Sequence, residues 1–178
     1  MPYLVAAVVF VGLLCAADLL LTLAVIRRLR EHTRQLGGLT GAAAPELLAA
    51  GAPVPAFSSE SVDGVPVDSQ TSAPAFVGFL STTCQSCADQ LPELVDFLSA
   101  GGMQRHAAVV VVAGPDSAEG ERFVDELRPL STVIREERHG PVCHAFSNEI
   151  FPTFYLAEDG VVTASSISVA GLVDPVPA

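Results

Sequence analysis

Hydrophobic residues are distributed in two ways, as one long continuous run near the start and as short alternating segments further on. The run covers 3–26 and contains a single ionisable side chain, Asp18. As a helix it would span roughly 36 Å, enough to cross a hydrocarbon core of about 30 Å with some tilt. It lacks the polar face of a buried core helix, and no positive charge precedes it as in a cleavable signal. We therefore expect an uncleaved, single-pass transmembrane anchor in the cell membrane.

The flanks of this anchor bear on its orientation and its contacts. No basic residue precedes it, whereas four arginines follow it closely: Arg27, Arg28, Arg30 and Arg34. The positive-inside rule then favours a cytoplasmic C-terminal domain. Asp18 is either a polar defect, hydrated or protonated, or a docking point for a partner helix in the membrane. Cys15 is most simply a small apolar residue within the anchor.

The remaining segments predict one folded domain behind a spacer. We divide the chain into an anchor with its juxtamembrane helix (1–34), a Gly/Ala-rich linker (35–52), a domain (53–170) and a tail (171–178). At the start of the domain, Asp63-Gly64 lies between short alternating segments, which is a hairpin signal. At the C-terminal end, 168–178 has weak helix signals, and we expect it to form a loose tail.

From Ala75 onward, runs with strand periodicity alternate with runs of helical periodicity. Strands are expected at 75–80, 106–114, 131–136, 152–158 and 161–165, and helices at 84–99, 117–128 and 140–149. Pro92 should bend the first helix, Gly101-Gly102 should end it, and Asp116 or Ser117 should cap the second. The strand at 106–114 is too uniformly apolar to lie at an edge. This order predicts an α/β fold with a central apolar sheet.

Charge narrows the classes of partner. The formal net charge is −11, and residues 35–178 carry 18 acidic side chains against five arginines. A surface of that sign repels phosphate backbones, so a nucleic acid is not an expected partner. No Gly-rich phosphate loop, paired catalytic carboxylates or Ser/His/Asp arrangement is present in the sequence, and we expect no cofactor.

The strongest chemical signal is the Cys84-Gln85-Ser86-Cys87 motif, which follows an expected core strand and opens an expected helix. Unpaired N–H groups and the helix dipole at that position stabilise an anion and so favour the thiolate of Cys84. Cys87 lies one helical turn further on, close enough to form a disulfide with it. Attack by Cys84 on a partner's disulfide would give a mixed disulfide that Cys87 resolves. The motif predicts thiol–disulfide chemistry.

Other interpretations of these cysteines remain open. The pair is either a core feature, half of a zinc site completed by Cys143 with His139 or His144, or the two thiols of a soft-metal carrier. A zinc ribbon needs a second cysteine pair, which the sequence lacks, and we assign no metal ligands. Cys143-His144 is expected to be a packing cysteine beside a surface imidazole. A non-catalytic subunit of a membrane complex is the remaining alternative.

Three stretches together resemble a known family. They are Phe79-Leu80-Ser81-Thr82-Thr83-Cys84-Gln85-Ser86-Cys87 with Leu91-Pro92, Phe151-Pro152-Thr153-Phe154-Tyr155-Leu156 with Asp159-Gly160, and Ala52-Pro53-Val54-Pro55-Ala56-Phe57 with Asp63-Gly64. Their order and spacing resemble the TlpA-like membrane-anchored thioredoxins, and within these the methylamine-utilisation proteins of the MauD type. The resemblance covers nearly the whole chain and implies a thioredoxin-like fold.

The resemblance also implies roles for individual residues. Cys84 would be the nucleophile and Cys87 the resolving thiol, acting on a disulfide-containing client protein. Phe151, Pro152 and Thr153 would form the substrate-binding platform, with the Phe151-Pro152 bond in the cis form that only a small minority of X-Pro bonds adopt. The family's domains lie outside the cytoplasm. We expect an extracytoplasmic domain on that ground, although the arginine distribution favours the opposite side.

The sequence departs from related enzymes behind the cysteine pair. Many thioredoxin-like enzymes hold a buried acid six residues before the first cysteine or six after it, to move the proton of the resolving thiol. These positions are Gly78 and Gln90 here, and neither side chain transfers protons. Asp89 is one residue displaced and should point elsewhere on the helix. Proton transfer would then have to use water, which predicts slow turnover as a reductase.

Overall fold

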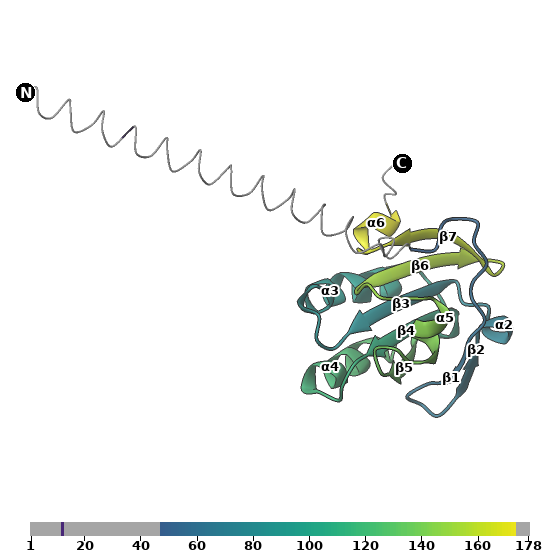
Figure 1. The fold of residues 1–178 in the computed structure, drawn as a ribbon, viewed down its shortest axis with the longest axis horizontal. Coiled ribbons are helices and arrows are strands. Elements are labelled where there is room, and N and C mark those ends of the chain that lie inside the picture. The colour runs from purple at the N-terminus through teal and green to yellow at the C-terminus, as the bar shows by residue number, and fades with distance from the viewer. Residues whose placement is uncertain (1–11, 13–46, 174–178) are drawn as a thin grey trace, which may run out of the picture. The chain divides into compact units, whose positions relative to one another are not determined.

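Figure 1 shows the computed structural model of the chain, which describes residue 12 and residues 47–173. The expected anchor, apart from Gly12, lies outside the described residues, and so do Cys15, Asp18 and the four arginines that follow. Among the residues that are described, no helix has both the length and the apolar character needed to cross a membrane.

A mixed five-stranded sheet in the order β5-β4-β3-β6-β7 forms the centre of the domain. Its strands are β3 (Phe76–Ser81), β4 (Ala108–Ala113), β5 (Thr132–Glu136), β6 (Thr153–Glu158) and β7 (Val161–Ser166). β3, β4 and β5 are parallel, whereas β6 runs antiparallel to β3 and β7 antiparallel to β6. β4 lies inside the sheet and is wholly buried, as its uniformly apolar sequence predicts. All five expected strands are confirmed.

Helices and a hairpin cover the two faces of this sheet (Figure 1). The remaining elements are β1 (Ser58–Glu60), β2 (Pro66–Asp68), α2 (Ser69–Ser72), α3 (Gln85–Ala100), the 3₁₀ turn η1 (Arg105–Ala107), α4 (Ala118–Leu127), α5 (Pro141–Ala145) and α6 (Ala170–Val173). One core cluster packs α3 and α4 against the sheet, and a second packs α5 and the hairpin against it. The expected hairpin around Asp63-Gly64 is confirmed as the antiparallel pair β1–β2.

Local sequence signals explain where the two long helices begin and end. Leu91, Leu94 and Leu98 of α3 are buried on one side of the helix, at the spacing that brings side chains onto a single face. The Gly101 amide closes this helix by donating to the Phe97 carbonyl at 3.0 Å. Ser117 caps α4, since its hydroxyl accepts from the Gly120 amide at 3.1 Å. The predicted helix boundaries are confirmed to within a few residues.

The packed region extends beyond the expected limits of 53 and 170 at both ends. Leu47 and Leu48 pack against the second core cluster, within the stretch expected to be linker. The expectation of a loose tail from residue 168 is wrong for its first part, because Val169 and Leu172 are buried in the first cluster. These two apolar side chains are three residues apart and lie on one face, so their burial holds the short helix α6 against the first core cluster.

Candidate active site

Cys84 occupies the junction between β3 and α3, where it is the N-terminal capping residue of the helix. The preceding loop is fixed to the neighbouring strand, because the Thr82 amide donates to the Ala113 carbonyl at 3.0 Å and its hydroxyl to the Pro115 carbonyl at 3.3 Å. Cys84 is half-buried and carries a free thiol. That thiol donates to the Phe151 carbonyl oxygen at 3.3 Å, across 67 residues of sequence.

Cys87 lies one turn into α3 and is completely buried. The Ser81 amide donates to its sulfur at 3.3 Å, and both thiols of the motif are free. Burial is the main cause that raises the pKa of the Cys87 thiol, and the contact with Cys84 adds to it. The structure therefore contains a reduced dithiol with one accessible and one inaccessible sulfur.

The Phe151-Pro152 peptide bond is cis, as the resemblance implies. It immediately precedes β6, whose first residue, Thr153, pairs with Phe79 of β3. Phe151 is half-buried, whereas Pro152 and Thr153 are buried. The Thr153 hydroxyl donates inward to the Ile150 carbonyl at 2.7 Å, so its side chain shapes the turn and is not exposed to a client.

The sequence matches no protein-family model and no curated protein. Among solved structures, the chain is similar to the thioredoxin domain of a thiol-disulfide oxidoreductase from Bacteroides vulgatus, with a TM-score of 0.56 and 18% identity over 70% of this chain and 93% of that one. The chain has a thioredoxin-like fold.

Two further solved structures with the same thioredoxin-like fold are similar to it. A thio-disulfide isomerase from Thermus thermophilus gives a TM-score of 0.53 and 22% identity, covering 67% of this chain and 86% of that one. A secreted Mycobacterium tuberculosis disulfide oxidoreductase, described as homologous to DsbE of E. coli, gives 0.52 and 16%, covering 63% and 83%. These similarities show the fold of the domain that carries the cysteine pair.

In this thioredoxin-like domain the space behind Cys87 is apolar. Gly78 lies in the middle of β3, and a Cβ added there would come within 3.0 Å of the Phe76 ring and 3.3 Å of the Phe154 ring. These two rings, stacked with centroids 6.1 Å apart, fill the position where related enzymes hold an acid. A side chain larger than that of glycine at position 78 would therefore meet these rings, which agrees with the absence of a proton acceptor there.

The two polar residues further along α3 have other partners. Gln90 accepts from the Val169 amide and donates to the Ile167 carbonyl, each at 3.1 Å, and so fastens the start of α6 to the helix. Asp89 is exposed and accepts from the Gln85 side chain at 2.9 Å. Neither residue is hydrogen-bonded to Cys87, and the exposed Asp89 side chain points away from the core, as the sequence predicts.

The thioredoxin-like domain has a depression beside Cys84. Its volume is about 400 Å³ and its lining residues are Thr82, Thr83, Cys84, Gln85, Ala88, Glu119 and Arg122. Arg122 is bound within its own helix by two carboxylates, Glu119 at 3.1 Å and Glu126 at 3.0 Å. The depression therefore opens directly onto Cys84, and its one arginine is already neutralised.

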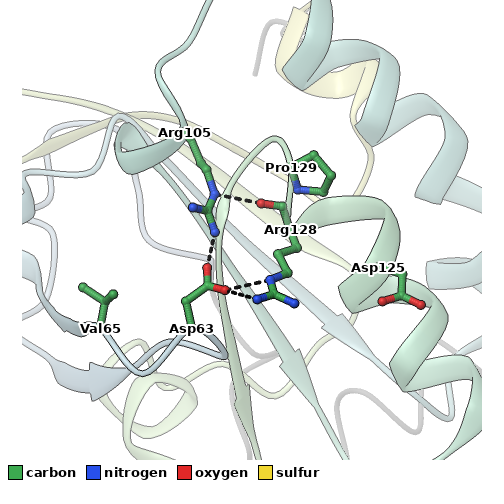
Figure 2. A pocket seen from close by; sticks show the side chains of 6 residues that line it. All are labelled: Asp63, Val65, Arg105, Asp125, Arg128 and Pro129. Carbon is green, nitrogen blue, oxygen red and sulfur yellow. Dashed lines mark hydrogen bonds and ion pairs between the residues drawn. The ribbon is translucent and has the colours of Figure 1, made fainter.

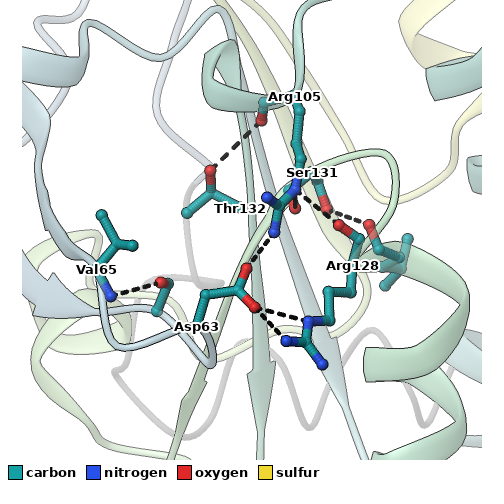
Figure 3. Close-up of polar contacts among 8 residues, drawn as sticks. Asp63, Val65, Arg105, Arg128, Ser131 and Thr132 are labelled. Carbon is teal, nitrogen blue, oxygen red and sulfur yellow. Dashed lines mark hydrogen bonds and ion pairs between the residues drawn. The ribbon is translucent and has the colours of Figure 1, made fainter.

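Figure 2 shows a larger depression of about 540 Å³, lined by residues of the β1–β2 turn, of η1 and of the C-terminal end of α4. It lies before the starts of β4 and β5, whereas Cys84 follows the end of the parallel strand β3. Asp63 accepts there from Arg105 and from Arg128, whose Nε lies 2.7 Å away. Arg105 also donates to the carbonyls of Arg128 and Ser131, as Figure 3 shows. Both guanidinium groups hold the pKa of Asp63 below its usual range. This cluster ties the β1–β2 hairpin to η1 and to the end of α4, and it contains no nucleophile.

Cys143 is a packing cysteine, as expected. It is buried in the core cluster on the α5 side of the sheet, whereas Cys87 belongs to the cluster on the other side. Burial first, and then the neighbouring Glu136 carboxylate, raise the pKa of its thiol. Across the described residues, no group of three or more metal-binding side chains gathers that could hold an ion. The zinc site that would combine Cys143 with the motif is therefore not formed.

Sequence reasoning missed Arg138. It follows β5, and its guanidinium carbon lies 5.3 Å from the centre of the Phe151 ring. The carboxyl ends of β3 and β5 lie at the same edge of the sheet because these strands are parallel to β4. Cys84 and Arg138 are therefore both placed at that edge, and this topological signal could have drawn attention to the arginine.

Proposed function

We propose that this protein is a thiol–disulfide oxidoreductase that acts on the disulfide bonds of a specific partner protein. The observation that supports it best is the contact between the Cys84 thiol and the carbonyl of Phe151, the residue before the cis-proline. This contact places the half-buried Cys84 sulfur beside the peptide group that precedes the cis-proline, where an incoming polypeptide can align its own cysteine. The names of the solved structures that share the fold agree with this chemistry.

The residues suggest the following sequence of steps. The Cys84 thiolate, at the N-terminus of α3, attacks one sulfur of the client disulfide, and the other client sulfur leaves as a thiolate. Cys87 then loses its proton to a water-derived base and attacks Cys84, which releases the second client thiolate. The client gains two electrons and the domain is left with a Cys84–Cys87 disulfide. The same steps in reverse oxidise a client dithiol.

The test is an equilibrium titration of the full-length chain, purified in detergent, against glutathione redox buffers. Free thiols are trapped by a polyethylene-glycol maleimide and counted by gel shift. We expect Cys84 and Cys87 to become protected together, and the oxidised protein to transfer its disulfide to a reduced, unfolded test protein. Cys84→Ser should abolish the transfer, whereas Cys143→Ser, on the other face of the sheet, should preserve it. Alkylatable Cys84 and Cys87 in the most oxidising buffer would contradict the proposal.

We also propose, from the resemblance and from the apolar run at 3–26, that the domain is tethered to the cell membrane and faces the extracytoplasmic side. A membrane-impermeant maleimide applied to intact cells should then label the reduced motif in a Cys15→Ser, Cys143→Ser background. Labelling only after the cells are opened would place the domain in the cytoplasm. We propose in addition that the client is a disulfide-containing protein and that Asp18 contacts a partner helix in the membrane.

A further inference from the structure

Arg138 is joined to the nucleophile by a short series of contacts. Its guanidinium lies over the Phe151 ring at 5.3 Å, and the carbonyl of the same Phe151 accepts from the Cys84 thiol at 3.3 Å. Phe151 is anchored from below, since it packs against both core clusters. The cation is therefore held beside the platform on which an incoming disulfide would rest.

The charge of Arg138 is available in a way that the other described arginines are not. Each of those is paired with one or two carboxylates: Arg105 and Arg128 with Asp63, Arg122 with Glu119 and Glu126, and Arg135 with Asp116 and Glu121. Arg138 is exposed, and among residues 47–173 its contact is the face of an aromatic ring. A cation–π contact leaves the N–H groups of a guanidinium free to bind an anion.

Nearby acids do not cancel this charge. Glu136, two residues before it, directs its carboxylate to the amides of Val142 and Cys143 at 3.0 and 2.7 Å. Glu137 is exposed, and no ion pair joins it to Arg138 in the described part of the chain. In a domain with 16 acidic side chains against five arginines over residues 47–173, an unneutralised cation beside the active site is a marked local exception.

We propose that Arg138 is a specificity-determining residue that favours disulfides carrying a carboxylate close to the attacked sulfur. The inference rests on the proposed function and adds the chemistry of the preferred client, an acidic disulfide-containing segment. The net negative surface repels such a segment in general, so attraction at one point also sets where it docks. Because the contact is exposed, its contribution is modest and depends on salt.

The test uses three small disulfides with the reduced, full-length chain: glutathione disulfide, which is anionic, bis(2-hydroxyethyl) disulfide, which is neutral, and cystamine, which is cationic. Each reaction transfers two electrons from the Cys84–Cys87 dithiol to the small disulfide, and its rate is followed by acid quench and alkylation. Arg138→Gln should lower the ratio of the anionic to the cationic rate by about threefold to tenfold, and Arg138→Glu should lower it further. The neutral rate should not change.

Arg128→Gln is the matched control, because it removes the same charge between α4 and the start of β5, at the edge opposite to Cys84. It should leave the rate ratio within about 1.5-fold of the parent protein, and high salt should reduce the effect of Arg138→Gln. An equal fall in both variants, or no fall in Arg138→Gln, would overturn the inference while leaving thiol chemistry intact. No reaction with the neutral disulfide in any variant would instead overturn the proposed function.

Discussion

The mixed disulfide on Cys84 should be resolved by Cys87 about tenfold faster for each unit of pH increase through the neutral and mildly alkaline range. Only the Cys87 thiolate attacks, and burial raises the pKa of this thiol. Burial persists when Cys84 is bonded to a client, because Cys87 lies inside the core cluster of α3. Among the described residues no carboxylate is hydrogen-bonded to Cys87 to replace the missing proton acceptor at Gly78 or Gln90, so we expect hydroxide or buffer to remove the proton.

The measurement starts from protein whose Cys84 carries a chromophoric thiol leaving group, and it follows release of that group in stopped flow. The parent protein should show a rate that rises log-linearly with pH, over about a thousandfold between pH 6 and pH 9. Cys87→Ser should hold the mixed disulfide indefinitely, and it is therefore also the variant with which to capture the client. A rate independent of pH in this range would show that an internal group accepts the proton, contrary to the structure.

Restoring the acid that related enzymes carry should destabilise this domain strongly. Gly78→Asp would place a carboxyl between the rings of Phe76 and Phe154, which approach an added Cβ to 3.0 and 3.3 Å. The surroundings are side chains of one apolar core cluster, in which the Cys87 thiol is a weak hydrogen-bond donor. Burying a poorly partnered carboxyl group, together with overpacking, predicts a loss of about 3–5 kcal/mol in the free energy of unfolding.

Gly78→Ala separates the two causes. Alanine meets the same rings but carries no polar group, and it lowers the entropy of the unfolded chain, so we expect a loss of about 1 kcal/mol. Both variants are compared with the parent protein by urea unfolding, followed by far-UV circular dichroism in the same detergent. Equal losses would show that crowding alone matters. An aspartate variant as stable as the parent would show that the space behind Cys87 accommodates an acid after all.

Both predictions depend on the same feature, the Phe76 and Phe154 rings beside Gly78. The rings occupy the place of the acid, so no acid accepts the proton of Cys87 from that position. We expect formation of the mixed disulfide to be unaffected, because Cys84 is only half-buried, and we expect its resolution to be slowed. We therefore expect the intermediate to live longer than in enzymes with a buried acid, which favours a partner that binds tightly while it is attached.

The order of strands and helices was predictable from the sequence alone. A strand that is buried on both faces is a short continuous apolar run, as in β4, whereas apolar residues recur every third or fourth position along a helix such as α3. These patterns record which side chains leave water. The position of Cys84 at a strand–helix junction follows from the same patterns. The cis bond before Pro152 came instead from resemblance to a family, since spacing alone does not distinguish the two isomers.

Other features depend on residues that are distant in sequence and were decided only by the tertiary structure. The docking of α6 needs Gln90 of α3 to meet the amide of Val169, 79 positions later. The rings of Phe76 and Phe154 fill the space above Gly78 because β3 and β6 are neighbours in the sheet. Arg138 reaches Phe151 for a similar reason, since the ends of separate strands share one edge. Periodicity tells which side of an element is buried, but not which distant side chain it will meet there.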